Sequence, residues 1–191
     1  SIIHHVSPCL FCLICSLIIA YIYKWKRIYS LYRKENENMN IYDRLDELNL
    51  TLPKAPEPAG LYITSQTTGN LLYTSGQDCR AENGEFPFTG KVGVDLSVEE
   101  GYEAARLTAL NCLSVIEKEL GDLNRVKKIV KLLCFVNSKD DFIEQPSVMN
   151  GASQLLIDVF GDVGKHARTA VSAPSLPFNI PLEIEMIVEF E

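Results

Sequence analysis

The last ten residues, "LEIEMIVEFE", constrain the fold more than any other stretch, because apolar and acidic side chains alternate along them. Apolar residues occupy every even position from 182 to 190, and positions 183, 185, 189 and 191 are glutamates. A period of two is that of a β-strand whose two faces meet different surroundings. We therefore expect this strand to pack one face on an apolar layer and to turn the other towards something polar.

A second predicted strand, "HARTAV" at residues 166–171, carries Arg168 between small neighbours. Arginine is costly to bury unless an anionic group meets it. Arg168 could form a structural ion pair with Glu183 or Glu185 of the closing strand, or it could bind an anionic ligand. The pattern by itself leaves both interpretations open.

A long amphipathic helix is predicted after Ser97, which is a good N-cap and forms a capping-box pattern with Glu100. Apolar residues recur every three or four positions as far as Leu120, so one face is expected to be buried. Gly121 and Asp122 then end the helix.

The remaining elements complete an α+β pattern. Residues 62–68 and 71–77, joined by Gly69-Asn70, predict a β-hairpin, and residues 126–138 predict a strand buried on both faces. "PSVMNGASQLLIDVF" at 146–160 predicts a second helix with Pro146 near its start and Gly161 after its end. The order ββ-α-β-α-ββ predicts a sandwich with two helices on one face of a mixed sheet.

Charge is distributed unevenly along the 191 residues, whose formal net charge is −7. Residues 1–38 contain five Lys/Arg and two Glu, a net of +3, whereas residues 39–191 contain thirteen Lys/Arg and twenty-three Asp/Glu, a net of −10. Phosphates are bound by clustered basic side chains, so the acidic part argues against a general nucleic-acid binder. The length suits one domain, residues 39–191, preceded by an extension, residues 1–38.

The extension contains an uncharged apolar run, residues 6–23, at the lower limit for a membrane-spanning helix. The basic cluster that follows it would hold that flank on the cytoplasmic side. Two interpretations stay open: the run anchors the domain to a membrane, or the sequence starts upstream of a true N-terminus at Met39. Both place the domain in the cytoplasm.

Cysteines and histidines indicate neither a disulfide framework nor a metal site. Cys9, Cys12 and Cys15 lie inside the apolar run, and the other three cysteines, Cys79, Cys112 and Cys134, are scattered with no CxxC pair and no nearby histidine. Free thiols in a reducing compartment are the simplest interpretation. His166 is the one histidine outside the N-terminal extension, and no nucleophile motif such as GxSxG accompanies it. We expect it at the surface or at an interface.

Several motifs, in this order and spacing, are similar to those of the RidA/YjgF/UK114 family. They cover about residues 52–191 and include "AGLYITSQTTGNLLYTSGQ", "SVEEGYEAARLTALNCLSVIEKELGDLNRVKKIVKLLCFVNS", "VMNGASQLLIDVF", "HARTAV" and "LEIEMIVEFE". "FTGKVG" and "SLPFNIPLEIEMIVEFE" resemble a less characterised branch, sometimes called endoribonuclease-like or chorismate-mutase-like.

This resemblance implies a chorismate-mutase-like α+β fold that assembles as a homotrimer, with the sheets facing inward and the active sites in clefts between subunits. It also implies hydrolysis of reactive enamines and imines, such as 2-aminoacrylate, to 2-oxo acids and ammonia without a cofactor or metal. The implied ligand is a small carboxylate-bearing imine or 2-oxo acid, and no nucleic-acid partner is expected.

The resemblance also assigns roles to particular residues. Arg168 matches the family arginine that binds the substrate carboxylate, which suits a planar guanidinium. Glu183 matches the family acid that positions water and shuttles a proton, a role that needs a pKa raised by partial burial. Further residues match positions that line the cleft in relatives: Tyr62, Ser75, Gly76 and Asn150.

Plainer roles remain for these residues, since Glu183 could lie on a solvated strand face and Asn150 could make only local hydrogen bonds. Two positions depart from the family pattern: Leu61 replaces a common proline, and Ala170 replaces a common cysteine, which rules out thiol chemistry there.

Two other functions stay open. The chain could be a non-catalytic trimer that senses a 2-oxo acid, or an endoribonuclease, which the acidic domain disfavours.

Overall fold

The computed structural model describes residue 18, residues 21–27 and residues 40–191. The chain forms two units, Ser1–Met39 and Asn40–Glu191. Residues 21–27 of the first unit are helical, and most of the predicted membrane segment, residues 6–23, lies outside the described residues. Within the described part of the chain, no helix is long and apolar enough to cross a membrane.

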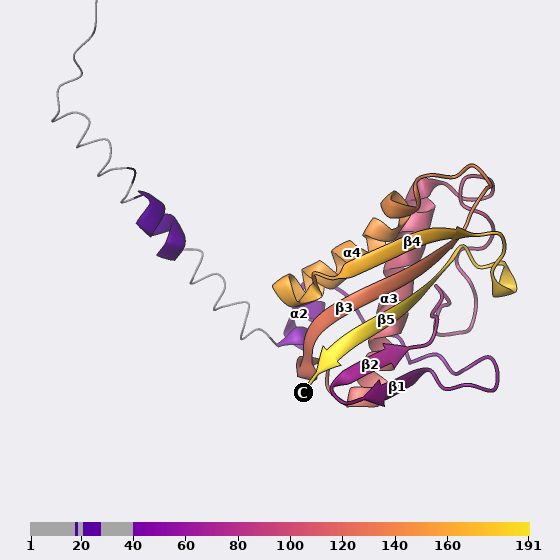
Figure 1. Ribbon diagram of the computed structural model, residues 1–191. Coiled ribbons are helices and arrows are strands. Elements are labelled where there is room, and N and C mark those ends of the chain that lie inside the picture. Colours follow the sequence, from indigo (N-terminus) through magenta and orange to yellow (C-terminus); the bar gives the residue numbers. More distant parts are fainter. Residues whose placement is uncertain (1–17, 19–20, 28–39) are drawn as a thin grey trace, which may run out of the picture. The chain divides into compact units, whose positions relative to one another are not determined.

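The second unit is built on one five-stranded sheet with the strand order β1-β2-β5-β3-β4 (Figure 1). β3 and β4 are parallel, and every other pair of neighbouring strands is antiparallel, so the sheet is mixed as predicted. The order along the chain also matches the predicted ββ-α-β-α-ββ. The strands are β1 (Ser65–Thr68), β2 (Leu71–Thr74), β3 (Val126–Asn137), β4 (Ala167–Ala173) and β5 (Leu182–Phe190).

The hairpin between β1 and β2 turns at Gly69-Asn70, as the sequence predicts, and Gly69 has a positive φ of 57°. Glycine adopts this left-handed conformation at no steric cost, which explains its place in a two-residue turn. The register pairs Thr68 with Leu71 across the turn. On its other side β2 pairs with β5, the central strand of the sheet.

Two long helices cover one face of the sheet (Figure 1). α3 (Val98–Leu120) begins at Ser97, whose side chain and that of Glu100 form the predicted capping box, and it ends at Gly121 with a φ of 75°. α4 (Gln145–Phe160) has Pro146 in its first turn and ends at Gly161. A short helix, α2 (Ile41–Glu47), precedes the sheet. Three 3-10 turns complete the unit: η1 (Leu123–Arg125), η2 (Gly161–Gly164) and η3 (Pro177–Asn179).

The hydrophobic core lies between the sheet and these two helices. The even positions of β5 from 182 to 188 are at most 1% exposed, and they meet the apolar stripe of α3 that includes Leu113 and Ile116. Burying an aliphatic side chain contributes roughly 1.5–3 kcal/mol, so the alternation of β5 determines which face of the sheet the helices cover.

β3 differs from its prediction, because it is not buried on both faces in this chain. Leu132, Cys134 and Val136 are fully buried against the helices, whereas Leu133 and Phe135 on the other face are only half-buried. The reason is that the described residues supply no second layer for that face, which also bears the glutamates of β5. The apolar residues of β3 therefore form one face that packs on the helices and one face that is only half-buried.

Candidate functional site

Glu183 lies in a surface cavity of about 290 Å³ at the start of β5, which we call the Glu183 cavity. Glu183 is next to Ile184, which is buried against the helices, so the alternation of a strand turns the Glu183 carboxyl group away from the helices. Tyr62 and Gly76 line the same cavity, so the structure brings three of the predicted residues together. The full lining is Pro56, Glu57, Ala59, Tyr62, Thr64, Gly76, Gln77, Asp78, Arg80, Pro177, Phe178, Ile180 and Glu183.

The carboxyl group of Glu183 sits in a setting that favours its protonated form. Desolvation by burial raises its pKa, and the nearby negative charges of Glu185 and then Asp78 raise it further. A carboxyl group whose pKa moves towards neutrality can both accept and return a proton, which general acid-base chemistry requires. The partial burial expected at this residue is therefore present.

Gly76 supports Glu183 through its lack of a side chain. A Cβ atom at Gly76 would overlap the carboxyl group of Glu183 and lie 2.7 Å from its Cγ. The Glu183 side chain therefore occupies the space that a larger residue at position 76 would fill. Ser75 holds this turn, because its hydroxyl donates a hydrogen bond of 2.6 Å to the Ile63 carbonyl.

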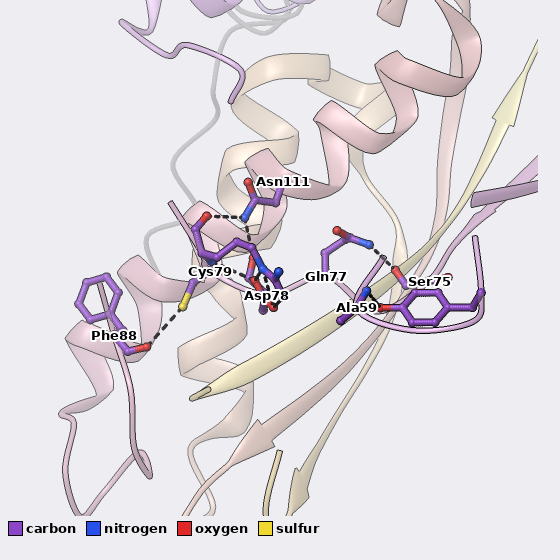
Figure 2. A network of polar contacts seen from close by, with 9 residues as sticks. Ala59, Ser75, Gln77, Asp78, Cys79, Phe88 and Asn111 are labelled. Carbon is purple, nitrogen blue, oxygen red and sulfur yellow. Dashed lines mark hydrogen bonds and ion pairs between the residues drawn. The ribbon is translucent and has the colours of Figure 1, made fainter. Parts of the chain in front are cut away.

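Tyr62 lies on the rim of the cavity, where its side chain is about half exposed. Its hydroxyl oxygen accepts a hydrogen bond of 3.1 Å from the backbone N–H of Ala59 (Figure 2). The phenol proton has no acceptor among the described residues, so it is available to a bound ligand.

The cavity also contains an ion pair that the sequence analysis did not single out. Arg80 donates to both carboxylate oxygens of Asp78, with Nε–Oδ1 and Nη2–Oδ2 distances of 2.9 and 2.6 Å. These hydrogen bonds raise the pKa of Arg80, so its guanidinium stays charged. Both residues lie in a segment predicted only as a loop, residues 78–95, and an Asp-x-Arg spacing there was the one available signal.

Arg168 lies elsewhere in the unit, on the edge strand β4, and points to the helix face. Its register partner Leu132 is buried against the helices. Nη1 donates to Asn150 Oδ1 at 3.1 Å and to Ser153 Oγ at 2.8 Å, and Nη2 donates to the Pro146 carbonyl at 3.2 Å. All three acceptors belong to α4, so the helix sets the orientation of the guanidinium.

No carboxylate forms an ion pair with Arg168 among the residues that the structure describes. The suggested structural pair with Glu183 or Glu185 is therefore absent from this chain. Three neutral oxygens orient the guanidinium without neutralising it, and Nε–H and one Nη2–H keep no partner in the described chain. An anion could take up both donors. Asn150 was predicted to line a cleft, and here it holds Arg168.

Arg168 and Glu183 do not meet within one chain. β3 lies between their strands, so the strand axes are roughly 10 Å apart, at about 4.8 Å for each neighbouring pair. Arg168 is level with Leu132 of β3, and Glu183 is level with Phe135, three residues further along. The two side chains also point to opposite faces of the sheet. A site that uses both residues needs one from each of two copies of the chain.

His166 belongs to the group around Arg168. Its ring nitrogens lie 3.0 Å from Ser153 Oγ and 2.6 Å from the Gly164 carbonyl oxygen. Desolvation lowers the pKa of His166, and the positive charge of Arg168 lowers it further, while the bond to Gly164 opposes both. A neutral imidazole beside Arg168 therefore adds no competing charge, and Ser153 links the two side chains.

The described part of the chain contains no cluster of three or more His, Cys, Asp or Glu that could hold a metal ion. Cys79, Cys112 and Cys134 are free and buried. Burial raises the pKa of the Cys79 thiol to about 11 and that of Cys134 to about 12, and it also raises that of Cys112. A reactive cysteine needs an exposed thiolate, so none of these three is a suitable nucleophile.

The fold and the two groups of residues define an α+β protein of the chorismate-mutase-like class, with a mixed sheet, two helices on one face and polar sites at the sheet's margins. Residues 42–190 match the family described as "YjgF/chorismate mutase-like, putative endoribonuclease". Because that match spans most of the chain, the protein belongs to the YjgF/RidA family.

Relatives within this family differ in what is known of them. The chain is 45% identical to protein TCP17 of Trypanosoma cruzi over 146 residues, which are 76% of this chain and 91% of that protein. It is 25% identical over 147 residues to a 2-iminobutanoate/2-iminopropanoate deaminase of Dermatophagoides farinae, covering 74% of this chain and 95% of that one.

A solved structure extends the likeness to three dimensions. The protein Atu1372 of Agrobacterium tumefaciens, whose function is unknown, is 43% identical with a TM-score of 0.74. The match covers 85% of this chain and 99% of that one. The predicted fold class and family are therefore confirmed, whereas the roles of the individual site residues stay predictions.

Proposed function

We propose that the protein hydrolyses reactive enamines and imines that carry a carboxylate, and that its active form is a homotrimer. The observation that carries this proposal is the uncompensated charge of Arg168, which α4 orients through three neutral oxygens. A guanidinium held in this way is suited to the carboxylate of an imino acid. The deaminase among the relatives supports the same reaction class.

The reaction needs only a water molecule and one acid-base group. The Glu183 carboxylate would take a proton from water as the water oxygen bonds to the carbon of the protonated imine, which gives a neutral carbinolamine. Glu183 would then return that proton to the nitrogen. As the C–N bond breaks, the hydroxyl oxygen forms the carbonyl group and its proton passes to the released ammonia, so the products are a 2-oxo acid and an ammonium ion. The raised pKa of Glu183 suits both steps, because the group must accept and release the same proton.

A homotrimer would account for the separation of the two residues. Arg168 and Glu183 point to opposite faces of one sheet, so a shared site would combine Arg168 of one copy with Glu183 of another. The open face of the sheet carries half-buried Leu133, Phe135 and Ile187, which a neighbouring copy would cover. We propose a cytoplasmic location for the same protein, which agrees with the free thiols of Cys79, Cys112 and Cys134.

Arg168→Ala is expected to abolish binding of the substrate carboxylate and to raise KM by about tenfold or more, the equivalent of roughly 1.4 kcal/mol or more. The assay couples an amino-acid oxidase, which generates the imine, to semicarbazide, which traps it. Wild type should suppress formation of the semicarbazone, and the variant should not. Arg106→Ala is a matched control, because Arg106 lies on α3 and, among the described residues, pairs with Glu103 of the same helix alone.

If wild type fails to accelerate imine hydrolysis on several amino-acid-derived substrates, the enzymatic proposal is wrong. The oxidase assay is therefore run together with light scattering, which reports the oligomeric state. A trimer that binds 2-oxo acids through Arg168 without turnover would point to a sensor, because the neutral acceptors on α4 could serve binding alone. An endoribonuclease is disfavoured by the net charge of −10 over residues 39–191.

Gly76→Ala is expected to lower the rate of imine hydrolysis by about 10²-fold, because a methyl group at this position displaces the Glu183 carboxyl group by about 1 Å or more. The backbone at Gly76 has no positive φ, so stability should change little. Gly60→Ala is the control, since its Cβ would only touch the Tyr62 ring at 3.4 Å. Steady-state rates and melting temperatures check both variants. Full activity in Gly76→Ala would argue against Glu183 as the acid-base group.

A further inference from the structure

Arg80 lines the Glu183 cavity, but it has no role in the proposed hydrolysis, which uses Arg168 and Glu183. Asp78 occupies its Nε–H and one Nη2–H. The two Nη1 protons and the second Nη2–H make no hydrogen bond with any described residue. A guanidinium can bind one carboxylate on its Nε edge and another on its Nη1/Nη2 edge, so Arg80 retains the capacity to bind a second anion.

The position of Arg80 is fixed from several sides. Asn111 of α3, only 2% exposed, donates to the backbone carbonyls of Asp78 and Arg80 at 2.8 and 2.9 Å (Figure 2). The guanidinium carbon lies 5.3 Å from the ring centroid of Phe86 and 5.8 Å from that of Phe178. An arginine that is already ordered loses little further side-chain entropy when a ligand binds.

Phe178 also lines the Glu183 cavity, and its backbone adopts an unfavourable conformation. Its φ is 57°, and that of the next residue, Asn179, is 55°. Asparagine tolerates the left-handed region, but a bulky residue such as phenylalanine rarely adopts it. The side chain is nevertheless 61% exposed, and its ring stacks on Phe86 with 5.8 Å between centroids. Strain that holds an exposed aromatic ring beside a cavity is typical of ligand-binding segments.

We propose that Arg80 binds a second carboxylate, at the far end of the substrate side chain, so that the preferred imines derive from dicarboxylic amino acids. This inference rests on the proposed deaminase function. The cavity of about 290 Å³ has room for about ten non-hydrogen atoms, at roughly 30 Å³ each, which exceeds what the imine of alanine needs. An imine with a two-carbon spacer and a terminal carboxylate would use that room.

The other charges of the cavity allow an additional anion. Asp78 is already paired with Arg80, and Glu57 is paired with Lys118 at 3.2 Å. Glu183 is the remaining carboxyl group in the lining. Arg80 is the one cationic side chain that lines the cavity within the described chain, so it decides whether an acidic side chain is accepted.

Binding of two 2-oxo acids to the full chain, measured by calorimetry, tests this inference without catalysis. The probes are 2-oxoglutarate and 5-methyl-2-oxohexanoate, which has the same shape with an isopropyl group in place of the distal carboxylate. Wild type should bind 2-oxoglutarate at least about tenfold more tightly, as a charge-assisted hydrogen-bonded pair predicts. Arg80→Met should abolish this preference. Arg80→Lys should keep part of this preference, because lysine keeps the positive charge but cannot bind a carboxylate through two parallel hydrogen bonds.

The double variant Asp78→Asn/Arg80→Met separates binding from stability, since it leaves no buried carboxylate unpaired. It should fold and should also lack the preference. In the oxidase-coupled assay, the loss should appear as a higher KM for 2-iminoglutarate with kcat retained. Arg106→Met is the control at a partly exposed position of α3 that does not line the cavity.

The possible outcomes distinguish this inference from the proposed function. Hydrolysis of imines without a preference for 2-oxoglutarate, or with a preference that persists in Arg80→Met and in the double variant, would overturn the role of Arg80 alone. Binding with the expected preference but without hydrolysis would overturn the deaminase and keep the Arg80 site. A wild-type protein that binds neither probe would contradict the inference directly.

Discussion

Glu183→Gln is expected to lower kcat for imine hydrolysis by about 10²–10⁴-fold, the usual contribution of a general acid-base group. Glutamine keeps the shape of the side chain but can neither take a proton from water nor return it to the leaving nitrogen. The cavity lining, including Gly76, should remain as it is, because the amide has nearly the size of the carboxyl group. Single-turnover rates on the same imines measure the change.

The pH dependence gives a second signature of Glu183. Burial and the neighbouring carboxylates raise its pKa, so kcat/KM should fall as the pH is lowered through a value above the usual 4.5 of a glutamate. Glu185→Gln is the matched control, because Glu185 lies two residues along the same face of β5. Removing its charge should lower the pKa of Glu183 and move this limb of the profile to lower pH, with the plateau rate retained.

The raised pKa of Glu183 also predicts how the free energy of unfolding depends on pH. The folded chain holds the Glu183 proton more tightly than the unfolded chain, so stability falls as the pH rises from the unfolded pKa to the raised folded pKa. Glu183→Gln removes the ionisable group and should leave the protein equally stable or more stable at neutral pH. An unchanged kcat in Glu183→Gln, with a melting temperature at least as high as that of wild type, would contradict the acid-base role.

Gly151→Ala is expected to destabilise the protein by about 1–3 kcal/mol or more, because the added methyl group has no room. A Cβ at Gly151 would overlap the backbone carbonyl oxygen of Tyr102 and lie 2.9 Å from its carbon. Gly151 is on α4 and Tyr102 is on α3, so the two helices can relieve the overlap only by moving apart. For a chain of this size, each kcal/mol lowers the melting temperature by roughly 2–4 °C.

A shift of α4 would also disturb Arg168, which depends on Asn150, Ser153 and the Pro146 carbonyl of the same helix. Calorimetric melting and the KM for imines therefore both report on this variant. Ser147→Ala is the control on an exposed position of α4 and should change stability by no more than about 0.5 kcal/mol. A melting temperature unchanged in Gly151→Ala would show that the helices do not cross as closely as the structure indicates.

Much of the fold could be predicted because local chemistry and the final packing agree. Ser97 and Glu100 cap α3 through contacts only three residues apart, and Gly69 makes its turn through its own backbone freedom. The alternation along β5 likewise depends on the strand alone. Within this chain β3 is packed on one face rather than on both, because an apolar composition does not reveal whether the same chain supplies a second layer.

The candidate site was less accessible from sequence, because its members are distant along the chain. The resemblance to the family suggested Glu183 and Arg168 as site residues, but only the strand order showed that β3 separates them. The Arg80–Asp78 pair went unnoticed, since nothing local marks a loop residue as the neighbour of Glu183. Ser153 was missed for the same reason: a serine within a helix acquires meaning only when Arg168 and His166 reach it from β4 and the turn before it.

The sequence alone determined the elements of this protein, their order and its membership of the family, because capping, turn formation and strand alternation act over a few residues. The tertiary structure alone decided which polar side chains share a surface. It placed Arg80 rather than Arg168 beside Glu183, and it placed Arg168 on the opposite face under α4. The physical reason is that side-chain neighbours across a sheet depend on strand order and register, which the packing of the whole core selects.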